Sequence, residues 1–308
     1  MTLNTVFMGT PAFAVPTLRA LHETFRVRGV VTQRDRPRGR GLRTTPTPVK
    51  AVAQELGLPV VEPDKLNSPE FLATLQSWNP DVIVVAAYGV ILPEPVLELP
   101  PLGCVNLHAS LLPRHRGASP ISAAILAGDT VTGVCTILMD RGMDTGDILL
   151  MQEIPIEEDD TAGTLHDKLL EPGARLVVET LTLLKENRIQ PKPQSKEGVT
   201  YTRPLTRADG RLEWQRPAVE LVRQVRAMDP WPAAFCMAKG EMIKIWQASL
   251  EPGRALPGEI TGLRSDGVLV GTGKELLLLR QAQAPSRKKV TAAELARSRG
   301  WHVGLRLE

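Results

Sequence analysis

The fold is decided near the N-terminus, where the chain reads LNTVFMGTPAFAVPTLRALHETFRVRGVV (residues 3–31). Residues 3–8 are mostly apolar and predict a buried strand, and Gly9-Thr10-Pro11 predicts the turn after it. Residues 12–23 then predict a helix, and residues 27–31 predict a second apolar strand. This order is a βαβ unit, and strands without polar alternation are typical of a parallel sheet covered on both faces. The turn lacks a Gly-x-Gly-x-x-Gly pattern, so it gives no reason to predict a dinucleotide-binding site.

The same pattern continues along the first two thirds of the chain. Thr47-Pro48 and Ser68-Pro69 each combine a hydroxyl N-cap with proline at the first helical position, so each predicts a helix start. These helices are expected to end at Gly57 and near Trp78. Further strands are predicted at residues 59–61, 81–87, 104–108, 132–139 and 148–154, and further helices at residues 120–127 and 161–187, the last kinked at Pro172.

The last third of the chain has a different pattern. Residues 189–206 are rich in Pro, Lys, Ser and Thr, which predicts a linker. Beyond it, short strand-like runs between glycine-containing turns predict a small β barrel with one helix at residues 218–227. The sequence therefore predicts an α/β protein. We expect a Rossmann-like, mostly parallel sheet domain at residues 1–188 and an OB-like β barrel at residues 207–308.

The composition is that of a globular protein. The chain has 308 residues, of which 43% are hydrophobic and 23% are charged, so it can build two cores. It begins without a signal-peptide pattern, and its most apolar stretch, residues 82–92, is too short to cross a bilayer. Cys104, Cys135 and Cys236 match neither a disulfide framework nor a metal site. We therefore expect a cytoplasmic protein with reduced core thiols and no membrane contact.

The net charge of +3 is unevenly distributed along the chain. Residues 1–200 hold 19 Lys and Arg against 23 Asp and Glu, whereas residues 201–308 hold 18 against 11. A basic second part predicts an anionic partner, and nucleic acid is one candidate. A solvated basic surface without a partner explains the same charges equally well.

A second basic feature reads TQRDRPRGRGLRTTPTP (residues 32–48). It has no apolar periodicity and predicts a long exposed loop, and such loops are usually functional or disordered. Arginine at this density binds phosphate readily. From the residues alone, phosphate binding and a disordered charged segment stay equally open. The arginines of this loop are Arg34, Arg36, Arg38, Arg40 and Arg43.

Candidate catalytic residues lie in the stretch CVNLHASLLPRHRGASP (residues 104–120). Asn106 and His108 are two residues apart, so in a strand their side chains share one face. An amide N–H suits a developing oxyanion, and an imidazole can move a proton near neutral pH. The pair therefore predicts polar chemistry on a carbonyl group.

A loop with three acids follows the strand predicted at residues 132–139. It reads DRGMDTGD (residues 140–147), and its place in the sheet suggests the same end as Asn106 and His108. An acid at that position would hold and polarise the imidazole. A tight polar turn without a catalytic role is the competing interpretation.

These motifs together resemble a known family, the 10-formyltetrahydrofolate-dependent formyltransferases. The segments similar to the family signature are Asn106-Leu107-His108, Ser110-Leu111-Leu112-Pro113, Arg116-Gly117, Pro120-Ile121 and Asp144-Thr145-Gly146-Asp147. The similarity extends over essentially the whole chain through Gly9-Thr10-Pro11, Thr32-Gln33, Ala87-Tyr88-Gly89 and Trp231-Pro232. Ala109 and Met143 stand where relatives often carry Gly and Leu, and neither change alters the chemistry.

The resemblance implies an activity and its partners. A formyl group would move from N10 of 10-formyltetrahydrofolate to the α-amine of methionine on initiator tRNA, for translation initiation. The folate would be a co-substrate, with no tightly bound cofactor, no metal and no covalent enzyme intermediate. The first domain would bind the folate and the second would bind the tRNA. We expect a monomer.

The resemblance also implies roles for individual residues. The catalytic set would be Asn106, His108 and Asp144, with the Asp144 carboxylate raising the pKa of His108 and helping to relay a proton. The implied folate contacts are Ser110, Leu111, Leu112, Pro113, Ile91 and Leu92. The implied tRNA contacts are Arg36, Arg38, Arg40 and Arg43, among which Arg40 matches the family's key basic position.

Three other functions stay open at this point. A formyltransferase for another amine, such as glycinamide ribonucleotide or an amino sugar, would not need the arginine loop and the basic barrel. A hydrolase would split 10-formyltetrahydrofolate with water. A catalytically silent nucleic-acid-binding protein would not need Asn106, His108 and Asp144. The sequence also does not single out RNA contacts among Arg203, Arg207, Arg223, Arg287, Lys288 and Lys289.

Overall fold

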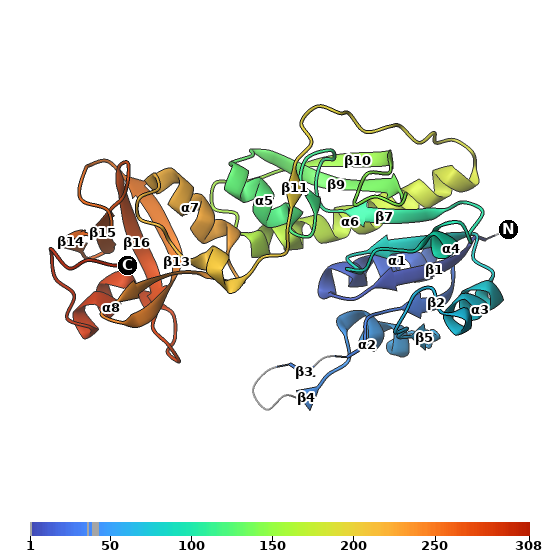
Figure 1. Ribbon diagram of the computed structural model, residues 1–308, viewed down its shortest axis with the longest axis horizontal. Helices are drawn as coiled ribbons and strands as arrows, with labels where there is room; N and C mark the ends of the chain where they lie inside the picture. The colour runs from blue at the N-terminus through green and yellow to red at the C-terminus, as the bar shows by residue number, and fades with distance from the viewer. Residues whose placement is uncertain (1, 36, 39–42) are drawn as a thin grey trace. The chain divides into compact units, whose positions relative to one another are not determined.

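A computed structural model of the chain describes residues 2–35, 37–38 and 43–308 (Figure 1). These residues cluster into two compact units. The first unit contains the residues up to Pro120, Val131–Pro155 and His166–Arg203, and the second contains Ile121–Thr130, Ile156–Leu165 and Pro204–Glu308. The division after Arg203 lies inside the predicted linker, and the domain boundaries at residues 188 and 206 stay a prediction.

The first unit is built on a seven-stranded sheet, coloured from blue to green in Figure 1. Its strands in spatial order are β10 (Asp147–Pro155), β9 (Val131–Leu138), β7 (Cys104–His108), β6 (Val82–Ala86), β1 (Asn4–Gly9), β2 (Arg26–Val31) and β5 (Val60–Val61). The strands from β7 to β5 run parallel to one another, whereas β9 is antiparallel to both of its neighbours. The predicted mostly parallel α/β sheet is confirmed.

Helices connect these strands, and two of them begin as their caps predict. The Thr47 hydroxyl accepts a hydrogen bond from the backbone N–H of Lys50 at 3.1 Å, and the Ser68 hydroxyl accepts one from that of Phe71 at 3.3 Å. Each cap contributes about 1 kcal/mol to helix stability. The helices are η1 (Ala12–Ala14), α1 (Val15–Thr24), α2 (Pro48–Glu55), α3 (Pro69–Trp78), α4 (Glu94–Leu97), α5 (Pro120–Ala127) and α6 (Ala162–Lys185). Within the described ranges, no helix is both long and apolar enough to span a bilayer.

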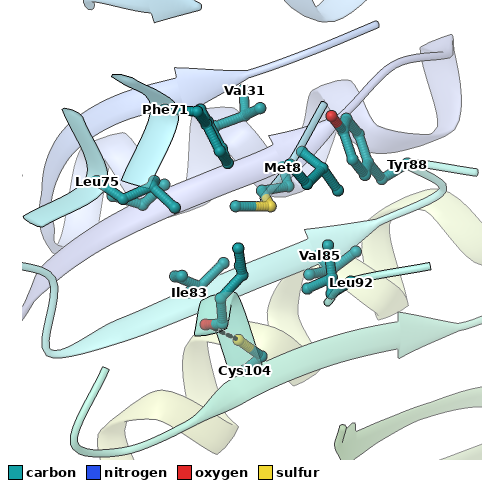
Figure 2. Close-up of a cluster of buried hydrophobic side chains, with 12 residues drawn as sticks. Met8, Val31, Phe71, Leu75, Ile83, Val85, Tyr88, Leu92 and Cys104 are labelled. Carbon is teal, nitrogen blue, oxygen red and sulfur yellow. Dashed lines mark hydrogen bonds between the residues drawn. The ribbon is translucent and has the colours of Figure 1, made fainter. Parts of the chain in front are cut away.

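A hydrophobic core lies between α3 and the central strands of the first unit (Figure 2). Phe71 and Leu75 come from α3, Met8 comes from β1, and Ile83 and Val85 come from β6. Alternate residues of a strand share one face, which is why Ile83 and Val85 enter the core together. Burying each of these side chains contributes roughly 1.5–3 kcal/mol relative to leaving it in water.

The same core anchors the chain where it leaves β6. Tyr88 and Leu92 are each 3% exposed and belong to the cluster in Figure 2. Burial also raises the pKa of the Tyr88 hydroxyl to about 12. The segment between them is therefore fixed at both ends, and Ile91 in its middle is 68% exposed.

All three thiols are buried, as the sequence predicts. Cys104 and Cys135 lie in the first unit and Cys236 in the second, and each is a free cysteine. Burial raises the pKa of each thiol to about 12. The thiols therefore stay protonated near neutral pH, which makes them poor nucleophiles.

The second unit contains a six-stranded antiparallel sheet, coloured orange and red in Figure 1. Its strands in spatial order are β12 (Ala234–Ala238), β13 (Glu241–Glu251), β16 (Leu276–Gln283), β15 (Gly267–Gly271) and β14 (Ile260–Arg264), with β17 (Val290–Thr291) paired to β16. The helical elements are η2 (Arg207–Gly210), α7 (Ala218–Ala227) and α8 (Ala292–Ser298), of which α7 packs on β13 and α8 on β16. The predicted small β domain and its helix at residues 218–227 are confirmed, whereas the sequence analysis missed α8.

Two segments predicted as loops contain short paired strands. In the arginine-rich loop, β3 (Pro37–Arg38) pairs antiparallel with β4 (Arg43–Thr44). In the predicted linker, β11 (Tyr201–Thr202) pairs in parallel with β8 (Arg116–Gly117), within the first unit. The second half of the linker is thereby tied to the turn that follows His108.

Candidate active site

β7 carries the two side chains that the sequence singles out. Asn106 and His108 lie on one face of the strand and are 9% and 5% exposed. β6 and β9 bind the two edges of β7 through backbone hydrogen bonds. A side chain on an interior strand is held more rigidly than one on a loop, so the Asn106 carboxamide and the His108 imidazole each have a fixed orientation.

Asp144 brings a carboxylate to both side chains. Its Oδ1 accepts a hydrogen bond from Asn106 Nδ2 at 3.4 Å, and its Oδ2 lies 3.6 Å from His108 Nδ1. The backbone N–H of Gly117 donates a hydrogen bond to Oδ2 at 2.7 Å. The structure therefore brings the three sequence-predicted residues together. It adds a backbone donor, Gly117, that no side-chain pattern could reveal.

Asp144 reaches this position by a route that the sequence does not predict. Because β9 runs antiparallel to β7, Leu138 at its end pairs with Val105 near the start of β7. The expectation that the acidic loop leaves the sheet at the same end as His108 is therefore wrong. The loop instead folds back toward His108, and Asp144 adopts a left-handed backbone with φ of 53°. Non-glycine residues in this region carry strain and cluster at functional sites.

The hydrogen bonds of His108 define which of its ring nitrogens carries a proton. Nε2 lies 3.0 Å from the carbonyl oxygen of His115. A carbonyl oxygen can only accept, so we assign the proton of the neutral ring to Nε2. Nδ1 is then the basic nitrogen, and it faces the Asp144 carboxylate at a distance slightly too long for a hydrogen bond.

Burial and charge act on the His108 ring in opposite directions. Burial lowers the pKa of His108 below its ordinary value, and the Asp144 carboxylate raises it by less, so the net shift is downward. The Asp144 carboxylate therefore raises the pKa of His108 as expected, but desolvation lowers this pKa by more. The ring is consequently neutral near pH 7, with Nδ1 ready to take a proton.

This arrangement can carry out polar chemistry on a carbonyl group. The Asn106 carboxamide has two N–H donors, one of which points to Asp144, and the other can stabilise an oxyanion. His108 can accept a proton at Nδ1, and Asp144 would stabilise the imidazolium that forms. In the described part of the chain, no group of three or more His, Cys, Asp or Glu residues is placed to hold a metal ion.

The sequence-predicted folate contacts fall into two classes. Ser110 is buried, and its hydroxyl donates to the carbonyl oxygen of Arg114 at 2.7 Å, so it shapes the turn. Leu112 and Leu92 are each 3% exposed and belong to hydrophobic clusters. Leu111 is half-buried and Ile91 is exposed, so these two can meet a ligand directly. The last residue of the set, Pro113, is half-buried and lies in the turn after Leu112.

A cavity of about 460 Å³ lies in the first unit. Ile91 and Tyr88 line it together with Gln33 and Arg34, which follow β2, and with the segment after β5. In an open α/β sheet, ligands bind outside the carboxyl ends of parallel strands, and all of these residues follow such ends. Asn106 and His108 lie on the neighbouring strand of the same sheet, but they do not line this cavity.

Two of the four predicted tRNA-contacting arginines lie outside the described residues. Arg36 and Arg40 are outside the described residues, and Arg38 and Arg43 are placed only by their backbone in β3 and β4. At the base of the loop, Lys50 Nζ donates to the Asp35 carboxylate at 2.6 Å.

The Lys50 ammonium also bonds the Glu62 carboxylate at 2.8 Å. These bonds lower the pKa of Asp35 and raise that of Lys50. Asp35 and Lys50 therefore stay charged near neutral pH, and their ion pair fixes the point where the arginine-rich loop leaves the sheet.

Two lysines, Lys289 and Lys244, lie near the indole ring of Trp246 in the second unit. Lys289 Nζ lies 3.5 Å from the centroid of the indole ring, and Lys244 Nζ lies 5.6 Å from it. The indole N–H donates to Gln283 Oε1 at 3.0 Å, which fixes the ring. An ammonium over an indole face is stabilised by about 0.5–2 kcal/mol. Of the basic residues that the sequence left undistinguished, Lys289 is the one that this ring holds in place.

Two family models match the chain and identify its class. The family model described as "Formyl transferase" matches residues 3–181, and "Formyl transferase, C-terminal domain" matches residues 204–300. The first match covers the whole sheet of the first unit and all three clustered polar residues. The chain therefore belongs to the formyl transferase family.

Named relatives make the comparison more specific. Methionyl-tRNA formyltransferase of Desulfotalea psychrophila is 47% identical over 292 residues, which are 94% of this chain and 90% of that protein. Among solved structures, an N-formyltransferase from Helicobacter canadensis, in complex with folinic acid and dTDP-3-aminofucose, has a TM-score of 0.66 at 17% identity. That match covers 92% of this chain and 100% of the other.

A larger protein shares the fold as well. HypX from Aquifex aeolicus, solved in complex with tetrahydrofolic acid, has a TM-score of 0.62 at 18% identity. The match covers 96% of this chain and 47% of HypX, so the chain spans about half the length of that protein. At such identities the two solved structures show a shared fold.

Proposed function

We propose that this protein transfers the formyl group of 10-formyltetrahydrofolate to the α-amine of methionyl-tRNA, the initiator species, to give formylmethionyl-tRNA. The observation that carries the proposal is the contact of one carboxylate, Asp144, with both Asn106 and His108. The identity of 47% with a methionyl-tRNA formyltransferase over nearly the full chain supports the choice of acceptor.

Asn106 acts on the oxygen of the formyl group. When the amine attacks the formyl carbon, a C–N bond forms and the carbonyl oxygen becomes an oxyanion. A carboxamide N–H fixed on an interior strand is in place before the charge develops, so little reorganisation is needed. The loss of one such donor typically costs about 2.7–4 kcal/mol of transition-state stabilisation.

His108 moves the proton that the reaction must relocate. The attacking nitrogen becomes positively charged and gives a proton to Nδ1 of the neutral ring. The Asp144 carboxylate stabilises the resulting imidazolium. The imidazolium then returns the proton to N10 of the folate as the C–N10 bond breaks, so tetrahydrofolate leaves neutral at N10 and the ring is neutral again.

The folate is a co-substrate in this reaction and not a resident cofactor. We place it against the turn at Ser110–Pro113 and the segment of Ile91 and Leu92. In this arrangement Leu111 and Ile91 contact the ligand, while the buried Leu92 and Leu112 support those surfaces from below.

The tRNA is bound through its phosphates. Arg36, Arg38, Arg40 and Arg43 of the loop lead the acceptor end to the formyl donor, and the basic second unit holds the body of the tRNA. The fixed ammonium of Lys289 over Trp246 supports this assignment. We further propose that the protein acts as a monomer in the cytoplasm, where charged tRNA is made and used.

The test is formyl transfer from 10-formyltetrahydrofolate to methionyl-tRNA by the wild-type protein and a His108→Ala variant. We expect product from the wild type and a loss of about 10²–10⁴-fold in the variant, because a general acid–base group is removed. His302→Ala is the matched control, since this histidine is exposed in the second unit, and it should keep full activity.

The outcomes separate the donor from the acceptor. Folate turnover without formylated tRNA would mean that the donor is right and the acceptor is another amine or water. No turnover of folate by a folded wild-type protein would overturn the proposal and leave a tRNA-binding protein as the alternative.

A further inference from the structure

The predicted linker contains a strap that crosses the active-site loop. Lys192 and Ile148 exchange two backbone hydrogen bonds, of 2.8 and 2.9 Å, next to that loop. Further on, the backbone N–H of Arg116 donates to the carbonyl oxygen of Thr200 at 2.9 Å, beside the turn after His108. We define the strap as residues 192–202. One end is bonded to β10, which follows the Asp144 loop, and the other is bonded to β8, which follows the turn after His108.

Gln194 lies near the start of the strap, and all of its hydrogen-bonding capacity is used there. Its Nε2 donates to the carbonyl oxygens of Asp144 at 2.8 Å and of Gly146 at 2.7 Å. Its Oε1 accepts from Arg116 Nε at 3.1 Å and from Arg116 Nη2 at 2.7 Å. One side chain therefore joins the acidic loop after β9 to the turn after β7.

Arg116 is itself firmly held. The residue is 8% exposed, and its Nη1 donates to the Tyr201 hydroxyl at 3.1 Å, with the guanidinium 5.8 Å from the ring centroid. Tyr201 belongs to β11, which pairs with the strand that contains Arg116. The two hydrogen bonds from Arg116 therefore fix the orientation of the Gln194 amide group, which keeps its N–H groups directed at the carbonyl oxygens of Asp144 and Gly146.

The backbone of Asp144 needs such a brace. A non-glycine residue at φ of 53° gives up roughly 1–2 kcal/mol relative to ordinary backbone. Its carboxylate is fixed by Gly117, but its carbonyl group is fixed by Gln194. Without the second bond the residue can relax, and its carboxylate would turn away from His108 Nδ1.

We propose that Gln194 is a positioning residue, which holds Asp144 in the left-handed conformation that directs its carboxylate to Asn106 and His108. The inference deepens the proposed function and rests on it, because it assigns a role in the same reaction. Gln194 does not touch the reacting atoms. It acts on the proton transfer through Asp144.

The decisive variant is Gln194→Glu. The carboxylate keeps the size of the side chain and can still accept from Arg116, but it cannot donate to the carbonyl oxygens of Asp144 and Gly146. Gln194→Ala removes both functions. Lys196→Ala is the matched control, since Lys196 is an exposed residue of the same strap.

We expect kcat of both Gln194 variants to fall by about 10- to 100-fold, as a displacement of about 1 Å in a catalytic group does. KM for the folate should change little. In Gln194→Ala, which adds no charge, the acidic limb of the pH–kcat profile should move to lower pH, because a carboxylate that turns away no longer raises the pKa of His108. Lys196→Ala should match the wild type in all three readouts.

A merely structural role would give a different result. Thermal unfolding would shift, but folded enzyme assayed well below that transition would keep the wild-type pH limb and kcat. Either that outcome or a fully active Gln194→Glu variant would overturn the inference. Failure of the wild-type protein to formylate methionyl-tRNA would instead count against the proposed function, so the two failures are distinguishable.

Discussion

His108 of the first unit and Lys289 of the second each carry a basic nitrogen, but the first is buried and the second is exposed. His108 is buried beside a carboxylate, and burial lowers the pKa of its ring. Lys289 is exposed, and its ammonium lies over the face of Trp246. Its charge also acts on Asp229, where it lowers the pKa of the carboxyl against the larger, opposite effect of burial. The first setting suits a group that gains and loses a proton, and the second suits a cation that binds an anionic partner. The difference separates catalysis from binding, and each half can be tested alone.

The largest effect is expected from Asp144→Asn. The variant keeps an oxygen for the N–H of Gly117 but removes the charge that stabilises the protonated His108. We expect kcat to fall by about 10²–10⁴-fold.

The pH dependence of Asp144→Asn has a defined sign. Burial still lowers the pKa of His108, and the opposing effect of the carboxylate is gone, so the pKa falls further. The acidic limb of the pH–kcat profile, measured at saturating methionyl-tRNA, should therefore move to lower pH than in the wild type. A profile of unchanged height and shape would show that Asp144 plays no part in proton transfer.

A smaller effect is expected from Lys289→Ala, and it should appear only in tRNA binding. Loss of one phosphate contact should raise KM for methionyl-tRNA roughly fivefold, equivalent to about 1 kcal/mol. The dependence of log KM on log salt should become shallower by about one unit. Neither kcat nor KM for the folate should change.

Arg264→Ala is the matched control for Lys289→Ala. This arginine lies in the same unit, but it is paired with Asp266 at 3.0 Å and with Glu251 at 3.4 Å. A neutralised cation contributes little to phosphate binding, so this variant should resemble the wild type. Equal effects of both variants on KM would mean that overall charge, and not the Trp246 cluster, governs binding.

The smallest effect is expected from Lys244→Ala. Its ammonium lies 5.6 Å from the Trp246 centroid, compared with 3.5 Å for Lys289, so the ring holds it more weakly. We expect KM for methionyl-tRNA to rise by about twofold or less. An effect larger than that of Lys289→Ala, measured at the same salt concentration, would reverse the ranking of the two lysines.

Much of the fold follows from local patterns. The apolar runs and the caps at Thr47 and Ser68 place β1, β2, β6, α2 and α3, because such signals act over a few residues. The spacing of Asn106 and His108 likewise indicates a shared face. The contact of Asn106 and His108 with Asp144 was correctly predicted only by the family resemblance. The reason based on topology was wrong, because β9 runs antiparallel to β7.

Other parts of the site have no local signal. The Gly117 N–H and the His115 carbonyl are backbone groups, which every residue type supplies. Gln194 sits in a stretch whose composition predicts a linker, and its amide group donates to backbone oxygens 48 and 50 residues away. Only a three-dimensional arrangement reveals such bonds. The lowered pKa of His108 has the same origin, because its burial depends on the whole sheet.

The three buried thiols give this chain a chemically silent background for labelling. Each has a pKa of about 12, so a maleimide at neutral pH finds almost no thiolate to react with. A single exposed cysteine introduced by Lys196→Cys would then carry the only dye. A second, introduced by Lys288→Cys, would report by energy transfer how far the two units stand apart before and after tRNA arrives.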